Sequence, residues 1–151
     1  MKAAPSRDFV LQCSNCGEEN PVALEDLDKR NRCGRCSTIL IKSNCLPKDV
    51  TDGSWEAEVA DSAVPVVAYF WGPNCPVCAN YDLSVRRMAA SFCGTAKVVA
   101  MNAEENPVTP KRYDLKGVPT VMIFSGGKLV AGLPGPRGEQ GLREILDRIT
   151  G

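Results

Sequence analysis

Residues 64–78 read Val-Pro-Val-Val-Ala-Tyr-Phe-Trp-Gly-Pro-Asn-Cys-Pro-Val-Cys, a run that contains a strand, a turn and the start of a helix. The segment from Val64 to Trp71 is apolar without polar alternation, which predicts a strand that is buried on both faces and central in its sheet. Gly72-Pro73-Asn74 ends this strand. A helix that ends at Gly94 is predicted next, because apolar residues recur every three or four positions, at Val77, Tyr81, Val85, Met88 and Phe92.

The elements around this segment predict an α/β domain. Asp52-Gly53-Ser54 is a turn and cap signal before the helical spacing of Trp55 and Val59. The segments that follow the first helix predict a strand over 97–103, a short helix or turn over 106–113, a hairpin of strands over 120–124 and 128–131, and a closing helix over 142–149. This order, β-α-β-α-β-β-α, predicts a mixed central sheet with helices on both faces.

The composition excludes several classes of protein. The chain has 151 residues, of which 44% are hydrophobic and 24% charged, and its 18 basic and 18 acidic residues leave no net charge. These values are ordinary for a globular protein, and a nucleic-acid-binding protein would usually be basic. No stretch approaches the roughly 18 apolar residues of a membrane helix, and the first residues lack the apolar core of a signal peptide. We therefore expect a cytoplasmic protein without nucleic-acid or membrane partners.

Cysteine is the distinctive residue of this chain, which has 8 Cys and 0 His. The absence of histidine excludes histidine-based catalysis and histidine metal ligands. In a reducing cytosol, closely spaced cysteines indicate metal or redox chemistry. The sequence divides into a small module over 1–46, too poor in apolar runs to fold on a core alone, and a larger domain over 47–151. The eight residues are Cys13, Cys16, Cys33, Cys36, Cys45, Cys75, Cys78 and Cys93.

Two C-x-x-C pairs in the small module predict a structural zinc site. Cys13 and Cys16 precede Cys33 and Cys36 by a spacer of 16 residues, which fits the zinc pattern C-x₂-C-x₁₅₋₂₀-C-x₂-C. Four thiolates complete a tetrahedron around one Zn²⁺ and leave no open position for catalysis. Each C-x-x-C pair forms a tight turn, here called a knuckle, that points two thiolates at the metal. Gly17 and Gly34 suit the tight backbone of these knuckles. We expect a zinc ribbon with its core at about 10–41; two disulfides or four free thiols are the alternatives.

The third pair, Cys75 and Cys78, lies where a buried strand meets a helix, which is typical of a redox motif. The helix N-terminus favours the thiolate, so Cys75 is predicted as the nucleophile and Cys78 as the resolving thiol. Pro76 fits the first helical position, which needs no N–H. The alternative is a pair of buried, inert cysteines. Cys45 and Cys93 are expected as free thiols, with a regulatory disulfide as the alternative.

The larger domain resembles the thioredoxin family over about residues 49–150. The matching residues are Phe70-Trp71 before the C-x-x-C motif, Asn102 to Pro107, Lys116-Gly117-Val118-Pro119-Thr120, Ser125-Gly126-Gly127-Lys128 and Gly135. With the small module, in which Arg32-Cys33-Gly34-Arg35-Cys36 also matches, the chain resembles the zinc-containing, thioredoxin 2 type of this family.

The resemblance implies a protein-disulfide reductase that acts on disulfide-containing proteins and is itself reduced by a flavin-dependent thioredoxin reductase. It implies that the Val118–Pro119 bond is cis and that the backbone of Val118 pairs with a bound peptide. The implied cofactors are one structural Zn²⁺ and the redox-active Cys75–Cys78 disulfide. The implied substrate groove is formed by Trp71, Asn74, Pro76, Val118, Pro119 and Gly135.

Four positions depart from the usual thioredoxin sequence. The motif is Cys-Pro-Val-Cys instead of Cys-Gly-Pro-Cys, and Asn74 replaces a tryptophan. Tyr69 and Ala100 stand where a buried aspartate and its lysine companion are expected. In the family, that aspartate takes up the proton of the resolving thiol, here Cys78. A tyrosine could do so only as the phenolate, and ionising a phenol at neutral pH costs about 4 kcal/mol, so water or another group has to take the proton of Cys78.

Two other functions remain open from the sequence. One is a zinc-ribbon module that binds proteins, as a chaperone does, with weak redox turnover. The other is a disulfide isomerase or oxidant that uses the same cysteines in the opposite direction, since thioredoxin and disulfide isomerase potentials differ by only about 4 kcal/mol.

Overall fold

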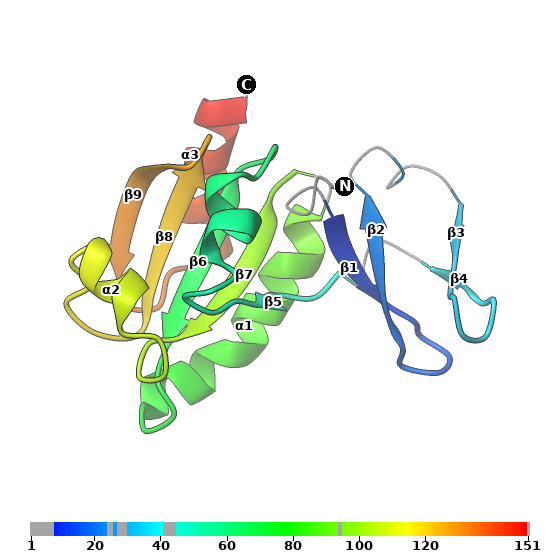
Figure 1. The fold of residues 1–151 in the computed structure, drawn as a ribbon, viewed down its shortest axis with the longest axis horizontal. Coiled ribbons are helices and arrows are strands. Elements are labelled where there is room, and N and C mark those ends of the chain that lie inside the picture. Colours follow the sequence, from blue (N-terminus) through cyan, green and yellow to red (C-terminus); the bar gives the residue numbers. More distant parts are fainter. Residues whose placement is uncertain (1–7, 24–25, 27–29, 41–44, 94, 151) are drawn as a thin grey trace.

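The computed structural model describes residues 8–23, 26, 30–40, 45–93 and 95–150. Two short β-hairpins lie on one side of the molecule and a five-stranded sheet with its helices on the other (Figure 1). The sheet contains β5 (Lys48–Asp49), β6 (Val66–Trp71), β7 (Lys97–Asn102), β8 (Thr120–Ser125) and β9 (Lys128–Pro134). The hairpins pair β1 (Asp8–Gln12) with β2 (Glu19–Ala23) and β3 (Asn31–Arg32) with β4 (Ile39–Leu40).

The sheet has the strand order β5-β7-β6-β8-β9. β5 and β6 run parallel to β7, whereas β8 is antiparallel to both β6 and β9, so the predicted mixed sheet is confirmed. β6 is the central strand, and its residues Val66 to Phe70 are all buried, as its apolar run predicts. β9 continues to Pro134, beyond the predicted end of that strand, because Pro134 still pairs with Thr120.

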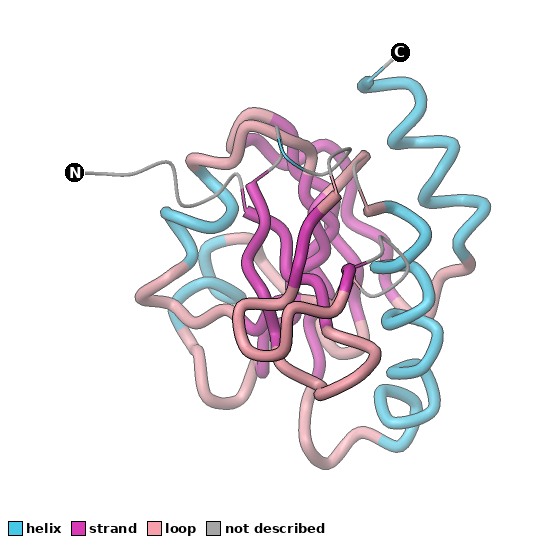
Figure 2. Tube along the Cα trace, turned by 90° about the vertical axis from the view of Figure 1, so that its right-hand side faces the viewer, coloured by secondary structure: helices cyan, strands magenta, loops and turns pink. Residues whose placement is uncertain are grey.

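Helices cover both faces of the sheet (Figure 2). α1 (Pro76–Phe92) and α3 (Glu139–Thr150) contribute to the core on the face that carries Val67 and Tyr69. The short helices η4 (Glu56–Ala60) and α2 (Val108–Arg112) flank the other face, where Trp55 packs on Phe70 and Phe124. The predicted α/β fold is confirmed, and Gly94, the predicted end of α1, lies outside the described residues.

The turn at Asp52 has a different role from the one predicted. Its carboxylate accepts hydrogen bonds from the backbone N–H groups of Val108 (3.1 Å) and Thr109 (2.8 Å) at the start of α2. The cap signal therefore serves a helix 56 residues further along the chain, and η4, which follows Asp52 directly, is a π-helical turn. Side-chain caps usually act on the adjacent helix, so local sequence could not show this pairing.

The hairpins contact the sheet domain through a small apolar cluster that contains Leu11, Val22, Leu40 and Val64. Val64 belongs to the segment before β6, so the cluster joins the two parts of the molecule. The segment that leads into β5 also pairs with β1, where the Leu46 N–H donates to the Val10 carbonyl at 3.0 Å.

Cys45 and Cys93 form a disulfide, so the expectation of two free thiols is wrong. Cys45 pairs with Leu11 of β1 through an isolated β-bridge, and Cys93 follows directly after α1. Their Cα atoms are 6.1 Å apart although 48 residues separate them along the chain. This distance suits a disulfide, and it arises because the bridge to β1 holds Cys45 beside the end of α1, which no local pattern encodes.

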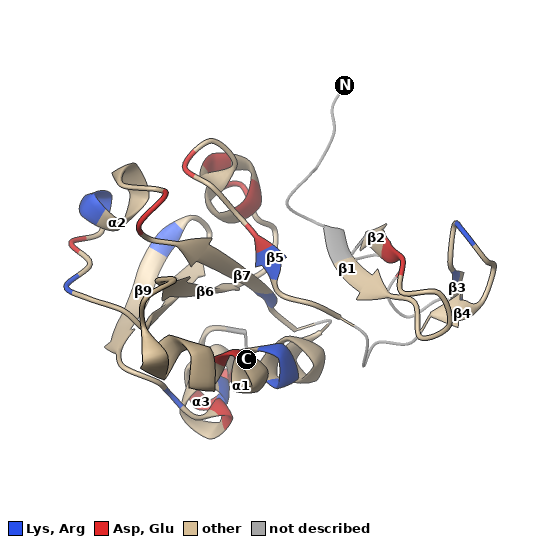
Figure 3. Ribbon diagram, turned by 90° about the horizontal axis from the view of Figure 1, so that it is seen from below, with Lys and Arg blue, Asp and Glu red and all other residues tan. Residues whose placement is uncertain are grey.

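Lys and Arg are interspersed with Asp and Glu over the described elements (Figure 3), which agrees with the balanced composition. One ion-pair cluster is buried: the Glu58 carboxylate contacts the ammonium groups of Lys97 and Lys48, the second at 2.9 Å. Burial opposes ionisation of Glu58, but hydrogen bonds from Lys97 and Lys48 outweigh it and lower the pKa of this carboxyl below its usual value. The cluster ties η4 to β5 and β7.

Replacing Glu58 by glutamine is expected to lower the free energy of unfolding by about 3–5 kcal/mol, because the buried Lys97 loses its carboxylate partner. The matched variant is Glu56→Gln, on the same helix η4 as Glu58. It breaks the exposed ion pair with Arg112 of α2 and should lower the free energy of unfolding by less than about 1 kcal/mol. Because folding lowers the pKa of Glu58, its stabilisation is present above the ordinary glutamate value near 4.3 and is lost as the pH falls through the lowered value. Urea unfolding of both variants between pH 3 and 7 checks this; equal losses for the two would contradict it.

Candidate functional site

The first candidate site is the Cys75–Cys78 pair at the start of α1. Cys75 is the N-cap of this helix in an extended conformation, and Pro76 occupies the first helical position, as predicted. The Cys78 N–H donates to Cys75 Sγ at 3.1 Å. The two cysteines form a disulfide with Cα atoms 5.2 Å apart, so the structure shows the oxidised pair.

The two sulfurs differ in their access to solvent. Cys75 is half-buried, whereas Cys78 lies one turn inside α1 and is only 2% exposed. Cys75 is thus the sulfur that a substrate can reach, and after reduction its thiolate would lie against the unpaired N–H groups of the helix start. The order predicted from the sequence, Cys75 first and Cys78 second, fits this arrangement.

Three residues of the predicted substrate groove are connected to the Cys75 sulfur, Val118 directly and Pro119 and Gly135 through the chain and one hydrogen bond. The Val118–Pro119 peptide bond is cis, as the resemblance implies, and the Val118 carbonyl oxygen lies 3.8 Å from Cys75 Sγ. The Pro119 carbonyl accepts a hydrogen bond from the N–H of Gly135 at 2.8 Å. Gly135 has a φ of +82°, a left-handed conformation that favours glycine. These contacts link β8, β9 and the start of α1 at one end of the sheet.

The other predicted groove residues surround the pair. Trp71 lines a cavity of about 330 Å³ together with Cys75 and Cys78. Asn74 and Pro76 flank Cys75 in the chain and are exposed. The same cavity is lined by Asp82, which the sequence analysis missed. Its position four residues after Cys78 was the available signal, because such residues share one face of a helix.

Tyr69 is anchored to the backbone of α1. Its hydroxyl donates to the Cys78 carbonyl at 3.1 Å, and its ring packs edge-to-face on Tyr81. Burial, together with the negative charge of Asp82, raises the pKa of Tyr69 to about 12. The phenol is therefore unsuited to act as a base. It stands beside Ala100 in the sheet, at the two positions where the thioredoxin pattern has an aspartate and a lysine.

The second candidate site is a cluster of four cysteine sulfurs in the hairpins. The sulfurs of Cys13, Cys16, Cys33 and Cys36 lie within 4.8 Å of one another. The Cys13–Cys36 and Cys16–Cys33 sulfur pairs are each 3.6 Å apart. Zn–S bonds of about 2.3 Å in a tetrahedron require sulfurs about 3.8 Å apart, so the cluster fits a Zn(Cys)₄ centre.

The two knuckles have the same backbone design. The N–H of Asn15 points to Cys13 Sγ (3.4 Å), as the N–H of Arg35 points to Cys33 Sγ (3.3 Å). Such N–H groups stabilise bound thiolates. Each knuckle also needs one left-handed residue, which is Gly17 (φ +80°) in the first and Ser37 (φ +67°) in the second.

Gly34 does not take the left-handed position of the second knuckle, which is Ser37. Gly34 has another role: its N–H donates to Asn20 Oδ1 at 2.9 Å and so connects the second knuckle to β2.

Among the described helices, none combines the length and apolar character needed to cross a membrane.

Comparison with known proteins agrees with this geometry. The family model described as thioredoxin matches residues 47–148, and the four-cysteine cluster lies outside the match. The chain is 37% identical over 99 residues to thioredoxin 1 of Nostoc sp. This alignment covers 66% of this chain and 92% of the relative. It is 40% identical over 81 residues to a thioredoxin of Synechocystis sp. Here the alignment covers 54% of this chain and 76% of the relative.

A third relative is thioredoxin M4, chloroplastic, of Arabidopsis thaliana, with 34% identity over 101 residues. The alignment covers 67% of this chain and 52% of the relative, so the chain spans about half of that protein's length. From the family match and the geometry of the cysteine pair, the chain belongs to the thioredoxin family of thiol–disulfide oxidoreductases.

Proposed function

We propose that this thioredoxin reduces protein disulfides through Cys75 and Cys78. The observation that carries the proposal is the pairing of a half-buried Cys75 at a helix start with a buried Cys78, next to a cis Pro119. The Cys75 thiolate attacks a substrate disulfide, forms a mixed disulfide and releases one substrate thiolate. Cys78 then attacks Cys75 Sγ, which releases the second thiolate. Two electrons pass to the substrate, and the chain ends as the disulfide seen in the structure.

The proposed substrate groove consists of Trp71, Asn74, Pro76, Val118, Pro119 and Gly135. Val118 lies two residues before β8, where an extended peptide could pair with its backbone beside the Cys75 sulfur. The proposed partners are disulfide-containing proteins and a thioredoxin reductase that returns two electrons to the pair. We propose the cytoplasm as the compartment, on the sequence features alone.

The four-cysteine cluster is proposed to hold one structural Zn²⁺, which would make this chain a zinc-containing thioredoxin of the thioredoxin 2 type. The distances between the sulfurs and the two N–H···S contacts support this. The metal would supply folding energy to the hairpins and no redox chemistry, because four protein ligands leave no open position. We retain 1–46 as the zinc-ribbon module and 47–151 as the thioredoxin domain; the start of the family match at residue 47 supports this division.

The redox potential of the Cys75–Cys78 pair tests the direction of the reaction. We expect a value near −270 mV, in the range of reducing thioredoxins. Equilibration with glutathione and dithiol buffers, followed by counting the free thiols of the pair, gives this potential. A value at or above about −180 mV would instead assign the Cys-Pro-Val-Cys motif to an isomerase or oxidant.

Replacing Tyr69 by aspartate is expected to accelerate the resolving step at neutral pH by about tenfold, because a carboxylate can accept the proton of Cys78 whereas the phenol cannot. Single-turnover kinetics of mixed-disulfide resolution measures this rate. Tyr69→Phe is the matched control, which keeps the ring packing and should leave the rate unchanged. An unchanged or slower rate in Tyr69→Asp, with the fold intact, would show that the missing carboxylate at this position does not limit the resolving step.

A further inference from the structure

The resolving step needs a proton acceptor, and the usual one is missing in this chain. Cys78 attacks as a thiolate and must first lose its proton, yet the position expected to carry an aspartate is Tyr69. The phenol of Tyr69 is committed as a donor to the Cys78 carbonyl. Ala100, beside it in the sheet, has no polar group to offer.

We propose that Asp82 accepts the proton of Cys78. The carboxylate for this step would then lie on the helix α1 instead of at the Tyr69 position of the strand β6. This inference rests on the proposed function and deepens it. Asp82 is four residues after Cys78, which places the two Cβ atoms about 5–6 Å apart on one face of α1. Both residues line the cavity of about 330 Å³ that also reaches Cys75 and Tyr69.

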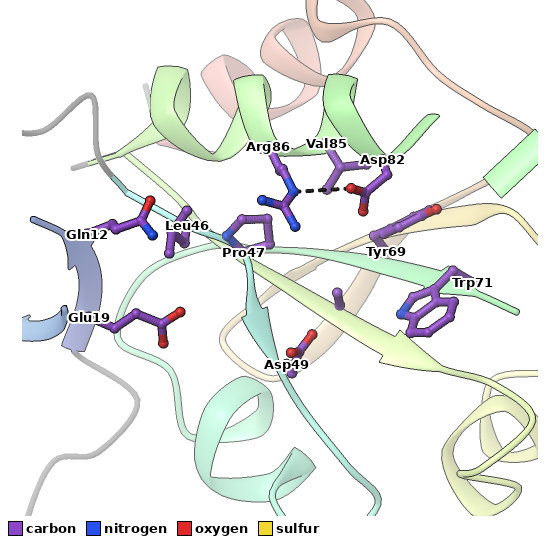
Figure 4. A pocket seen from close by; sticks show the side chains of 11 residues that line it. Gln12, Glu19, Leu46, Pro47, Asp49, Tyr69, Trp71, Asp82, Val85 and Arg86 are labelled. Atoms are coloured by element: carbon purple, nitrogen blue, oxygen red, sulfur yellow. Dashed lines mark hydrogen bonds and ion pairs between the residues drawn. The ribbon is translucent and has the colours of Figure 1, made fainter. Parts of the chain in front are cut away.

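The surroundings of Asp82 suit a group that takes up and returns protons. Asp82 also lines a second cavity of about 320 Å³, which lies between the hairpins and the sheet domain (Figure 4). Its side chain is 57% exposed, so it can exchange protons with the solvent. Each cavity is large enough to admit several water molecules, which can carry the proton from Cys78 Sγ to the carboxylate.

The charged and titratable groups around Asp82 come from four elements. On α1 itself, Arg86 forms an ion pair with it at 3.1 Å (Figure 4). Tyr69 faces it from β6, and Glu19 of β2 and Asp49 of β5 line the same cavity as further negative groups. Asp82 therefore faces one cation, one phenol and two further carboxylates.

The Cys78 thiol gives its proton to Asp82 through water, and the Cys78 thiolate attacks Cys75 Sγ. The Cys75–substrate disulfide breaks while the Cys75–Cys78 bond forms, and the substrate leaves as a thiolate. Asp82 then returns the proton to the solvent or to this thiolate. No oxidant is needed beyond the substrate disulfide itself.

Stopped-flow fluorescence of the full, zinc-loaded chain tests the proposal. Trp71 lines the cavity of both cysteines and so reports their state. Mixing the reduced protein with the aromatic disulfide dithiobis(nitrobenzoate) should give a first phase for attack by Cys75 and a second for resolution by Cys78. The second phase is identified by its absence in Cys78→Ser. The coloured leaving group departs as a thiolate, so the second phase isolates the loss of the Cys78 proton.

Asp82→Asn should leave the first phase unchanged and slow the second at least about tenfold near neutral pH. Its rate should then rise tenfold per pH unit, because hydroxide takes over as the proton acceptor. Asp82→Glu should restore most of the rate. Asp147→Asn, which removes an exposed carboxylate from α3, is the matched control and should match the wild-type protein.

Two results would overturn the role of Asp82. One is a second phase in Asp82→Asn within twofold of wild type from pH 5 to 8. The other is equal slowing by Asn and Glu with an unchanged pH profile, which would indicate a structural role. The absence of any Cys78-dependent phase in the wild-type protein would instead refute the proposed function from which this inference starts.

Discussion

Replacing Cys75 by serine is expected to lower the rate of protein-disulfide reduction at least about 10³-fold. The thiolate is the attacking species, and a serine hydroxyl is almost entirely protonated at neutral pH. Cys78 is only 2% exposed and cannot take over the first attack. The measurement is the steady-state reduction of a protein disulfide with dithiothreitol as the electron source.

Two matched variants sharpen this result. Cys78→Ser should retain the first attack and accumulate the mixed disulfide between Cys75 and the substrate, which mass spectrometry detects. Cys93→Ser removes a cysteine of the second disulfide, away from the pair, and should reduce disulfides at the wild-type rate. Disulfide reduction that persists in Cys75→Ser would contradict the proposed role of Cys75. Loss of reduction in every variant, the wild-type protein included, would favour a binding module.

The sequence was sufficient for the elements that carry their own pattern. The unbroken apolar run of β6 predicted a central strand, and the helical spacing after Cys75 predicted α1. The spacing of the four cysteines near the N-terminus predicted their convergence, which the structure places within 4.8 Å. In each case a short stretch of sequence determines the local geometry, and burial follows from its apolar residues.

Features that depend on docking between distant segments could not be predicted. The Cys45–Cys93 disulfide forms because β1 holds Cys45 beside the end of α1, a relation across 48 residues. The strand β5 has only two residues and exists through its pairing with β7. The relation of Asp82 to Tyr69 likewise requires α1 to lie on β6, since the two residues share no sequence pattern.

The left-handed knuckle position shows a different limit. Glycine is the usual residue for a positive φ, and Gly34 is the glycine of the second knuckle. Ser37 takes this conformation instead, because its N–H donates to the Cys33 carbonyl at 2.9 Å, as Gly17 does to Cys13 at 3.0 Å. The repeated position after the second cysteine of each pair was the better guide than the residue type.

Removing zinc is expected to unfold the hairpins and leave the thioredoxin sheet folded. Among the described residues, and apart from the cysteines, the apolar cluster of this part consists of Leu11, Val22 and Leu40 with Val64 of the larger domain. This is too little to hold four short strands. Structural zinc contributes about 10–16 kcal/mol in finger peptides, enough to fold such a segment. The metal-replete chain should contain one zinc, and a chelator should remove it.

Hydrogen exchange followed by mass spectrometry separates the two parts of the chain in this experiment. Chelation should abolish protection in β1 to β4 and preserve it in β6 to β8. Cys13→Ser should give the same pattern without a chelator, because it removes one of the four ligands. Cys45→Ser is the matched control, since it leaves all four ligands in place and should keep one zinc per chain. Fewer than about one zinc in the metal-replete wild-type protein, or protected hairpins in its absence, would show that the cluster does not depend on a metal.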